Sequence, residues 1–418
     1  MTTDSTIPDS PHANHGIDSA YAWARLAVTV LLSTIGGVGM WSVVVVLPAV
    51  EGEFGIARAD ASLPYTMTMI GFGLGGVMMG RLADRFGIVV PVVLGSSLLS
   101  LGYALSSLAD GIYQFTLIQG LLIGVGTSTT FAPLMADTSL WFMKRRGAAV
   151  GIIASGNYLA GAVWPPIVQH FVQLAGWRET HIGIALFCIA TMLPLAMLLR
   201  RRAPSVAPAA AMAFGGSLPV RPLGFSPGTL QMLLAIAAIS CCVAMAMPQV
   251  HLVAYCSDLG YGAARGAEML SLLLACGIIS RLTFGWISDH IGGLRTLMLG
   301  SFLQAFALSL YLMFDGIVSL YLVSALFGLF QGGIVPSYAI IVREYFSPRE
   351  AGRRVGVVMM ASLFGMAFGG WMSGVIYDAT ASYQIAFVHG IIWNLLNLSI
   401  AGWLLRLAWK RTAPASAV

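Results

Sequence analysis

The sequence has very little charge for its length. Only 9% of its 418 residues are Asp, Glu, Lys or Arg and 58% are apolar, whereas about 25% of a typical soluble protein is charged. A soluble domain could not cover its surface with so few charges. The apolar residues form long continuous runs, while a membrane β-barrel would alternate polar and apolar residues. The composition therefore predicts an all-α, multi-pass membrane protein.

Motifs for catalysis and for the use of ATP are also lacking. The chain has no phosphate-binding loop, no His-Glu-x-x-His and no paired acids inside an apolar run. Its five cysteines are odd in number, lie in apolar runs and have no metal-ligand spacing, which is typical of small packing residues. We therefore expect no enzyme activity, no cofactor and no metal site. The net charge of +5 does not indicate a nucleic-acid partner, because the placement of the basic residues explains it.

Twelve apolar runs are long enough to cross a bilayer, which takes about 20 helical residues. We place them at 25–49, 62–81, 88–109, 112–136, 147–172, 180–199, 229–255, 266–286, 294–314, 317–341, 354–377 and 383–405. Six precede and six follow a stretch rich in Pro and Ala. The predicted parts are a polar tail (1–22), a six-helix bundle (23–200), a linker (201–228), a second six-helix bundle (229–406) and a tail (407–418).

The basic residues indicate how these helices are oriented. If the two termini lie on one side of the membrane, 18 of the 22 Lys and Arg residues fall on that side and 3 on the other. Loops rich in Lys and Arg stay in the cytoplasm. We therefore expect both termini in the cytoplasm and the protein in the plasma membrane, which in a bacterium is the inner membrane.

Two segments of the chain repeat at one fixed spacing. The octamers Gly80–Gly87 and Gly285–Gly292 begin 205 residues apart and share both glycines and the central aspartate. The same spacing relates Gly147–Gly151 to Gly352–Gly356, which also share glycines and a valine. Two sets of matches at one offset indicate a duplicated unit. We therefore predict two pseudo-symmetric bundles.

Six plus six helices, a mid-chain linker and a Gly-x-Leu-x-Asp-Arg-x-Gly loop resemble the major facilitator superfamily. The segment Arg146–Gly151 and the later Gly176-Trp177-Arg178 are similar to the monocarboxylate porter and oxalate–formate antiporter branch, as is His251–Tyr255 followed by Arg281. The resemblance implies two bundles around a central cavity. It also implies secondary transport of a small monocarboxylate, such as lactate or pyruvate, by alternating access, with proton symport or anion exchange. We expect a monomer as the functional unit.

The chain departs from those relatives at charged positions. Animal monocarboxylate transporters have a functional lysine in the first helix, where this chain has Trp41, and an aspartate in the eighth, where it has Gly277. The lysine that the oxalate exchanger carries in its eleventh helix is also missing. The substrate site is therefore expected to hold fewer charges than in either relative.

Arg281 is the most informative single residue, because an arginine near the centre of a membrane helix costs about 2.5–3.5 kcal/mol on insertion scales. Its planar fork fits a carboxylate, so we predict that it binds the substrate anion. Two alternatives remain: its long stem could reach the membrane edge, or it could form a structural pair.

Further candidates are polar residues within or next to apolar runs. The predicted substrate contacts besides Arg281 are His251, Asn157, Gln331 and Tyr338. His251 and Asp258 are the candidates for proton coupling, since histidine titrates near neutral pH. For each of them the alternative is a structural role, as a hydrogen bond between helices or as a solvated helix end.

The repeated loops carry the predicted cytoplasmic gate. Its residues are Arg81, Asp84, Arg85 and Asp289. In the family this aspartate interacts with the start of a helix from the other half, which here lies near Gly352 for Asp84 and near Gly147 for Asp289. A carboxylate stabilises a helix N-terminus by about 0.3–1 kcal/mol. Such a contact would exist only while the cytoplasmic side is closed. The alternative is that the charged loops have no gating role and only determine the orientation of the helices in the membrane.

Two other functions stay open. The first is efflux of a neutral or lipophilic compound through an apolar, aromatic cavity, which a lack of competition by simple carboxylates would indicate. The second is a membrane sensor without transport, which would need a partner-binding domain that neither tail nor the linker provides. The expected partners are therefore the lipid bilayer, a small organic anion and a proton.

Overall fold

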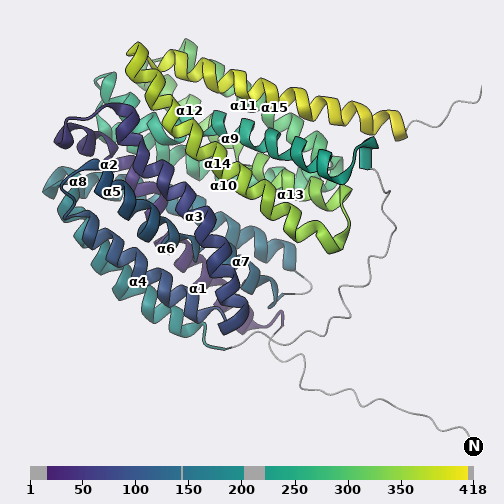
Figure 1. Cartoon of the computed structure of the whole chain (residues 1–418), viewed down its shortest axis with the longest axis horizontal. Helices are drawn as coiled ribbons and strands as arrows, with labels where there is room; N and C mark the ends of the chain where they lie inside the picture. The colour runs from purple at the N-terminus through teal and green to yellow at the C-terminus, as the bar shows by residue number, and fades with distance from the viewer. Residues whose placement is uncertain (1–16, 143–144, 202–221, 413–418) are drawn as a thin grey trace, which may run out of the picture.

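The protein is helical throughout the residues that the computed structural model describes, which are 17–142, 145–201 and 222–412 (Figure 1). The helices before residue 202 are α1 (Ala20–Gly36), α2 (Val38–Phe54), α3 (Arg58–Phe86), α4 (Val89–Ser106), α5 (Ile112–Ile118), a π-helical turn (Gln119–Gly124), α6 (Val125–Ser128), α7 (Ala132–Ser139) and α8 (Arg146–Leu198). Those after residue 221 are a short 3₁₀ turn (Pro222–Gly224), α9 (Pro227–Asp258), α10 (Ala263–Ile291), α11 (Gly293–Met313), α12 (Ile317–Gln331), α13 (Ile334–Tyr345), α14 (Pro348–Thr380) and α15 (Tyr383–Thr412). Much of the predicted linker and both tail ends lie outside the described residues.

Ten helical stretches among the described residues are long and apolar enough to cross a membrane. They do not include α3, which carries charged residues in its first and last turns. Large apolar side chains are turned outward, with Leu121 62%, Phe302 63% and Val318 71% exposed. An apolar surface of this kind is stable against lipid and not against water.

The predicted runs and the observed helices differ mainly at their joints. The runs at 25–49, 112–136 and 317–341 are each divided into more than one helical element, with breaks at Gly37, around the π-helical turn and at Gly332–Gly333. The runs at 147–172 and 180–199 are the two helical arms of α8, which meet at a kink. This helix changes direction at Gly176, whose φ of 84° is outside the helical range and is open to glycine at no steric cost.

Positive φ angles recur at the spacing of the repeated octamers. Gly87 and Gly292, which end α3 and α10, have φ of 84° and 82°. Gly55 and Gly260, which lie before the same two helices, have φ of 61° and 82°. The backbone therefore adopts similar turns at matching points of the two repeats.

The chain forms two groups of helices that lie side by side (Figure 1). The group before residue 202, in purple to blue, contacts the later group, in green to yellow, through α3 against α14, α8 against α10 and α2 against α9. We call the end where α3 and α10 finish, at Phe86 and Ile291, the motif end. The end where they begin, at Arg58 and Ala263, is the far end. In Figure 1 the two groups converge near α2 and diverge toward α7 and α13.

The contact between α3 and α14 tightens toward the far end. A Cβ atom on Gly374 would lie 2.6 Å from Ser62 Oγ and 2.9 Å from the carbonyl oxygen of Arg58, so only glycine allows this approach. At the motif end of α14, a Cβ on Gly352 or Gly356 would meet nothing within 4 Å. The two groups are thus pressed together at the far end and apart at the motif end.

Candidate functional site

Arg281 lies on α10 and extends its side chain to α8 in the other group of helices. Its NH1 donates a hydrogen bond to the carbonyl oxygen of Ala154 at 3.1 Å. Its Cζ lies over the ring of Tyr158, 4.1 Å from the ring centroid. Its Nε is buried and has no hydrogen-bond partner among the described residues. The guanidinium therefore lies between the two groups of helices.

Glycines create the space for this contact. A Cβ on Gly277, one turn before Arg281, would lie 2.3 Å from Cε1 of Tyr158, so the ring packs directly on the backbone of α10. On α8, a Cβ on Gly161 would lie 2.3 Å from Leu274 and 2.7 Å from the indole of Trp41. The close approach of α8 and α10 thus depends on one glycine from each helix.

Asn157 and Trp41 border the same contact. The indole N–H of Trp41 donates to the backbone oxygen of Asn157 at 3.1 Å, and the side-chain amide of Asn157 lies 3.6 Å from the sulfur of Met40. Asn157 adjoins Tyr158 in sequence, but within the described residues no hydrogen bond or ring contact joins Asn157 or Trp41 to Arg281, whose aromatic neighbour is Tyr158. No acidic side chain forms an ion pair with Arg281 in the described parts of the chain.

Gln331 and Tyr338 form their hydrogen bonds inside the later group of helices. The Oε1 of Gln331 accepts from Nε2 of Gln249 at 3.0 Å. The hydroxyl of Tyr338 donates to Oδ1 of Asn397 at 2.9 Å, and Asn397 donates to Ser301. Tyr338 belongs to a separate apolar cluster from the one that contains Tyr158 and Trp41. The structure therefore does not bring Tyr338 together with Arg281.

His251 is fully buried on α9 and has a partner on each ring nitrogen. Its Nε2 is 2.8 Å from the carbonyl oxygen of Gly370, which can only accept, so Nε2 carries the proton. Its Nδ1 is 3.2 Å from the hydroxyl of Tyr383. That hydroxyl oxygen accepts from NH1 of Arg58, so its own hydrogen is available to His251. The imidazole is thus the neutral end of a chain of hydrogen bonds that leads to Arg58.

Arg58, at the start of α3, is the centre of an ion-pair network at the far end. Its NH1 lies 3.0 Å from Oδ2 of Asp258 on α9, and its Nε is 2.5 Å from Oε2 of Glu51, although the N–H does not point at that oxygen. Its Cζ lies over the ring of Tyr377 at 4.5 Å. Asp258 is therefore the partner of Arg58 and not of Arg281. The network connects α2 and α3 with α9, α14 and α15.

Asp378, near the end of α14, adds a helix cap to this network. Its two carboxylate oxygens accept from the backbone N–H groups of Arg58 and Ala59, at 2.9 Å and 2.7 Å. These are the first residues of α3, whose preceding residue Ala57 provides no side-chain cap. A carboxylate from one group of helices thus stabilises a helix N-terminus in the other.

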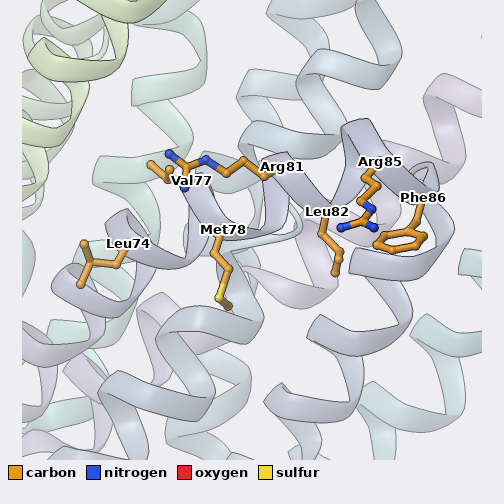
Figure 2. A pocket seen from close by; sticks show the side chains of 7 residues that line it. All are labelled: Leu74, Val77, Met78, Arg81, Leu82, Arg85 and Phe86. Atoms are coloured by element: carbon orange, nitrogen blue, oxygen red, sulfur yellow. The ribbon is translucent and has the colours of Figure 1, made fainter.

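The predicted gate residues at the motif end are all exposed, and the contacts expected of them are not formed. Within the described residues, Asp84 and Asp289 make no hydrogen bond or ion pair, and Arg85 lies over the ring of Phe86 at 5.1 Å. Arg81 lines a shallow groove along α3 (Figure 2). The groove is lined by Leu74, Val77, Met78, Arg81, Leu82, Arg85 and Phe86. The whole lining comes from one helix, so this face of α3 is not covered by the other group.

Sequence reasoning did not single out Tyr158, Arg58 or Asp378. Tyr158 adjoins the candidate Asn157, but nothing in the sequence indicates that its ring contacts Arg281, which lies 123 positions later in the chain. Arg58 is one of the three basic residues that the sequence places on the side of the membrane opposite to the termini. A search for acids at the same side of the membrane would have found Glu51, Asp258 and Asp378 as its neighbours.

The fold and the site together define a class. The chain is an all-helical, multi-pass membrane protein with a partly buried guanidinium between its two groups of helices.

Comparison with known proteins gives the family. The model of the Major Facilitator Superfamily matches residues 29–317 and 268–417, and the chain belongs to this superfamily. It is 28% identical over 316 residues to Monocarboxylate transporter 13 of Bos taurus, covering 75% of this chain and 73% of that one. Monocarboxylate transporter 4 of Rattus norvegicus is 24% identical, with 92% and 83% covered. The protein is therefore a transporter and not an enzyme.

Another relative is named for a different role. The Agnestins efflux protein AgnL12 of Paecilomyces divaricatus is 27% identical over 282 residues, covering 67% of this chain and 63% of that protein. Among solved structures, a bacterial homologue of the human lysosomal transporter Spinster, in an inward-facing and occupied conformation, has a TM-score of 0.77 at 15% identity. That match covers 95% of this chain and 100% of the other, and at this identity it shows the fold alone.

Proposed function

We propose that the protein is a secondary active transporter of a small monocarboxylate, such as lactate or pyruvate, which binds to Arg281 and crosses by alternating access. The observation that carries the proposal is the surroundings of Arg281. Its guanidinium is held between the two groups of helices by a carbonyl and an aromatic ring, without an acidic partner among the described residues. Its charge is therefore available to an anion.

The size and charge of the substrate follow from the same surroundings. One uncompensated cation favours a monoanion over a dianion, because a second carboxylate would be desolvated without a partner. The Tyr158 ring over the guanidinium offers an apolar face, which suits a short organic acid. Asn157, the residue before Tyr158 on α8, is the proposed contact for a polar substituent of the substrate. Two of the relatives are named monocarboxylate transporters, which agrees with this choice.

The proposed transport cycle uses both ends of the α3–α14 contact. Twelve crossings result if α3 is counted as one and the two arms of α8 as two, which gives two pseudo-symmetric bundles at 23–200 and 229–406. The excess of basic residues puts the motif end and both termini in the cytoplasm. The Arg58 network then closes the outer side, and the substrate site opens inward. In the opposite state the network separates and Asp84 caps the start of α14.

We propose that the protein acts as a monomer and that His251 and Asp258 couple transport to protons. The neutral imidazole of His251 is linked through Tyr383 to Arg58, which pairs with Asp258. A proton added to His251 would make Nδ1 a donor, so the ring could no longer accept the hydrogen of the Tyr383 hydroxyl, which itself accepts from Arg58. Uptake of a proton with the monoanion would therefore favour separation of the outer contacts.

The test is uptake of labelled pyruvate into proteoliposomes by the wild type and by Arg281→Ala. We expect the substitution to abolish uptake. The matched control is Arg265→Ala, which removes an exposed arginine of the same helix. Among the described residues its one ion pair is with Glu268, three residues later. Uptake by Arg281→Ala at the wild-type rate would remove the anion anchor and with it the proposal.

Efflux of a neutral or lipophilic compound is the second candidate. The aromatic ring of Tyr158 over Arg281 and the relative named as an efflux protein favour it. The two candidates differ in competition: simple carboxylates should inhibit a monocarboxylate transporter and leave an efflux transporter of neutral compounds unaffected. A screen of lipophilic compounds for inhibition of pyruvate uptake completes the comparison.

A further inference from the structure

Tyr158 restricts how Arg281 can bind a ligand. A guanidinium is planar and donates hydrogen bonds only in its plane, along two edges that each fit a carboxylate. In this structure the Tyr158 ring lies over the guanidinium, and NH1 already donates to Ala154. The other edge is formed by Nε and NH2. Its Nε is a buried donor, and none of the described residues accepts a hydrogen bond from it.

The position of the Tyr158 ring is itself tightly determined. The ring is 6% exposed and rests on Gly277, where an added Cβ would overlap its Cε1 at 2.3 Å. Its hydroxyl makes no hydrogen bond within the described residues, so the ring and not the hydroxyl carries the contact. A cation over an aromatic ring gains about 0.5–1 kcal/mol when exposed and about 2 kcal/mol or more when desolvated.

We propose that Tyr158 is a positioning residue: seated on Gly277, it fixes the guanidinium of Arg281 so that the Nε–NH2 edge receives the substrate carboxylate. This inference rests on the proposed role of Arg281 as the anion anchor. It assigns the orientation of the carboxylate, and it gives Gly277 a function, because any larger side chain there would displace the ring. Since Arg281 and Tyr158 belong to different groups of helices, the edge is presented correctly only while α8 and α10 are in contact.

The test is equilibrium binding of labelled pyruvate to the purified full-length protein, together with the maximal uptake rate. Tyr158→Leu removes the ring and should raise the Kd about tenfold, in line with the loss of a buried cation–ring contact. Tyr158→Phe keeps the ring and should bind within about twofold of the wild type. Tyr113→Leu, which removes a 72% exposed tyrosine of α5, is the control and should leave the Kd unchanged.

A double-mutant cycle separates positioning from general damage to the fold. Gly277→Ala alone should raise the Kd by displacing the ring, even though alanine favours a helix more than glycine does. In the Tyr158→Leu background the same substitution should add little, because the ring that it displaces is gone. Independent, additive losses from the two substitutions would overturn the inference, and so would a loss with Tyr158→Phe as large as with Tyr158→Leu.

The outcomes also distinguish this inference from the proposed function. If Arg281→Ala loses binding while Tyr158→Leu binds like the wild type, the positioning role is wrong and the anchor remains. If Arg281→Ala still binds pyruvate, the proposed function fails whatever Tyr158 does. Melting of each purified variant shows whether it is folded, and Gly277→Ala provides the test if Tyr158→Leu does not fold.

Discussion

Arg58 and Arg281 both cross between the two groups of helices, and their surroundings differ. Arg58 is paired with Asp258 and Glu51 and donates a hydrogen bond to the Tyr383 hydroxyl, so its charge is neutralised within the protein. Arg281 has one carbonyl and one aromatic ring. Both guanidinium groups lie over tyrosine rings, so the ring contact does not distinguish the two arginines. The acidic partners distinguish them: Arg58 has carboxylate partners, and Arg281 has none among the described residues. For this reason we propose Arg58 as a contact that holds the two groups together and Arg281 as the anion anchor.

The largest expected effect comes from Arg58→Ala. Removing one member of a buried ion pair costs about 3–5 kcal/mol, because the partner charges stay behind uncompensated. We expect the far end to open. Spin labels at Asp110 and Asp315, two exposed far-end positions in different groups of helices, should move apart, while labels at Leu140 and His290 at the motif end should approach.

The control for Arg58→Ala is Arg178→Ala. Arg178 is also a far-end arginine with an acidic partner, Glu53, but its contacts stay within the first group of helices. Its removal should leave the Asp110–Asp315 distance unchanged. Labels are attached in a background without the five native cysteines. Equal far-end opening in both variants would show that the Arg58 network does not hold the groups together.

Arg281→Lys sharpens the comparison from the other side. Lysine keeps the charge but loses the planar fork, so one carboxylate hydrogen bond should be lost. A hydrogen bond to a charged group contributes about 1.5–3 kcal/mol, which predicts a pyruvate Kd about 10- to 100-fold higher. The measurement is equilibrium binding at constant pH and salt. Wild-type affinity in this variant would show that a point charge is sufficient and that no edge of the guanidinium is used.

Asp378→Ala should act in the same direction as Arg58→Ala, but less strongly. Loss of a helix N-cap costs about 0.5–2 kcal/mol, and here the capped helix belongs to the other group. We expect partial far-end opening with the Asp110–Asp315 label pair. Asp378→Asn keeps an oxygen that can accept a hydrogen bond and should lie between alanine and wild type. A far-end distance unaffected by either substitution would mean that the cap follows closure without stabilising it.

The smallest effect on stability is expected from His251→Gln, which retains a donor and an acceptor at this position. Its effect should appear in the pH dependence of uptake. If a proton enters with the monoanion through His251, external acid should accelerate uptake by the wild type, and the glutamine variant should lose that acceleration. His181, which is also fully buried and bonds to Ser106, provides the control His181→Gln. Acid stimulation that survives His251→Gln would assign the proton elsewhere.

The membrane class and most helix positions could be predicted because hydropathy is a local property. The run predicted at 266–286 lies within α10, and that at 229–255 within α9. The observed helices are longer, since their polar ends extend beyond the apolar layer. The runs predicted at 147–172 and 180–199 correspond to the two helical arms of α8, which a kink at Gly176 separates.

The candidate site could be predicted only in part. Arg281 stands out because an arginine in a membrane helix is costly, and that cost is visible in the sequence. Its neighbour Tyr158 is not visible, since contacts between α8 and α10 arise only when both glycines allow the helices to meet. Asp258 was a candidate as an isolated acid, but its pairing with Arg58 depends on how two distant helix ends come together.

Binding of labelled pyruvate to the purified protein, compared between the wild type, Arg281→Ala and Arg265→Ala, tests the central claim most directly. With the anchor removed, the account predicts a Kd at least about 100-fold higher, as expected when two charge-assisted hydrogen bonds are lost, and an unchanged Kd in Arg265→Ala. Pyruvate binding by Arg281→Ala within about twofold of the wild type would contradict it.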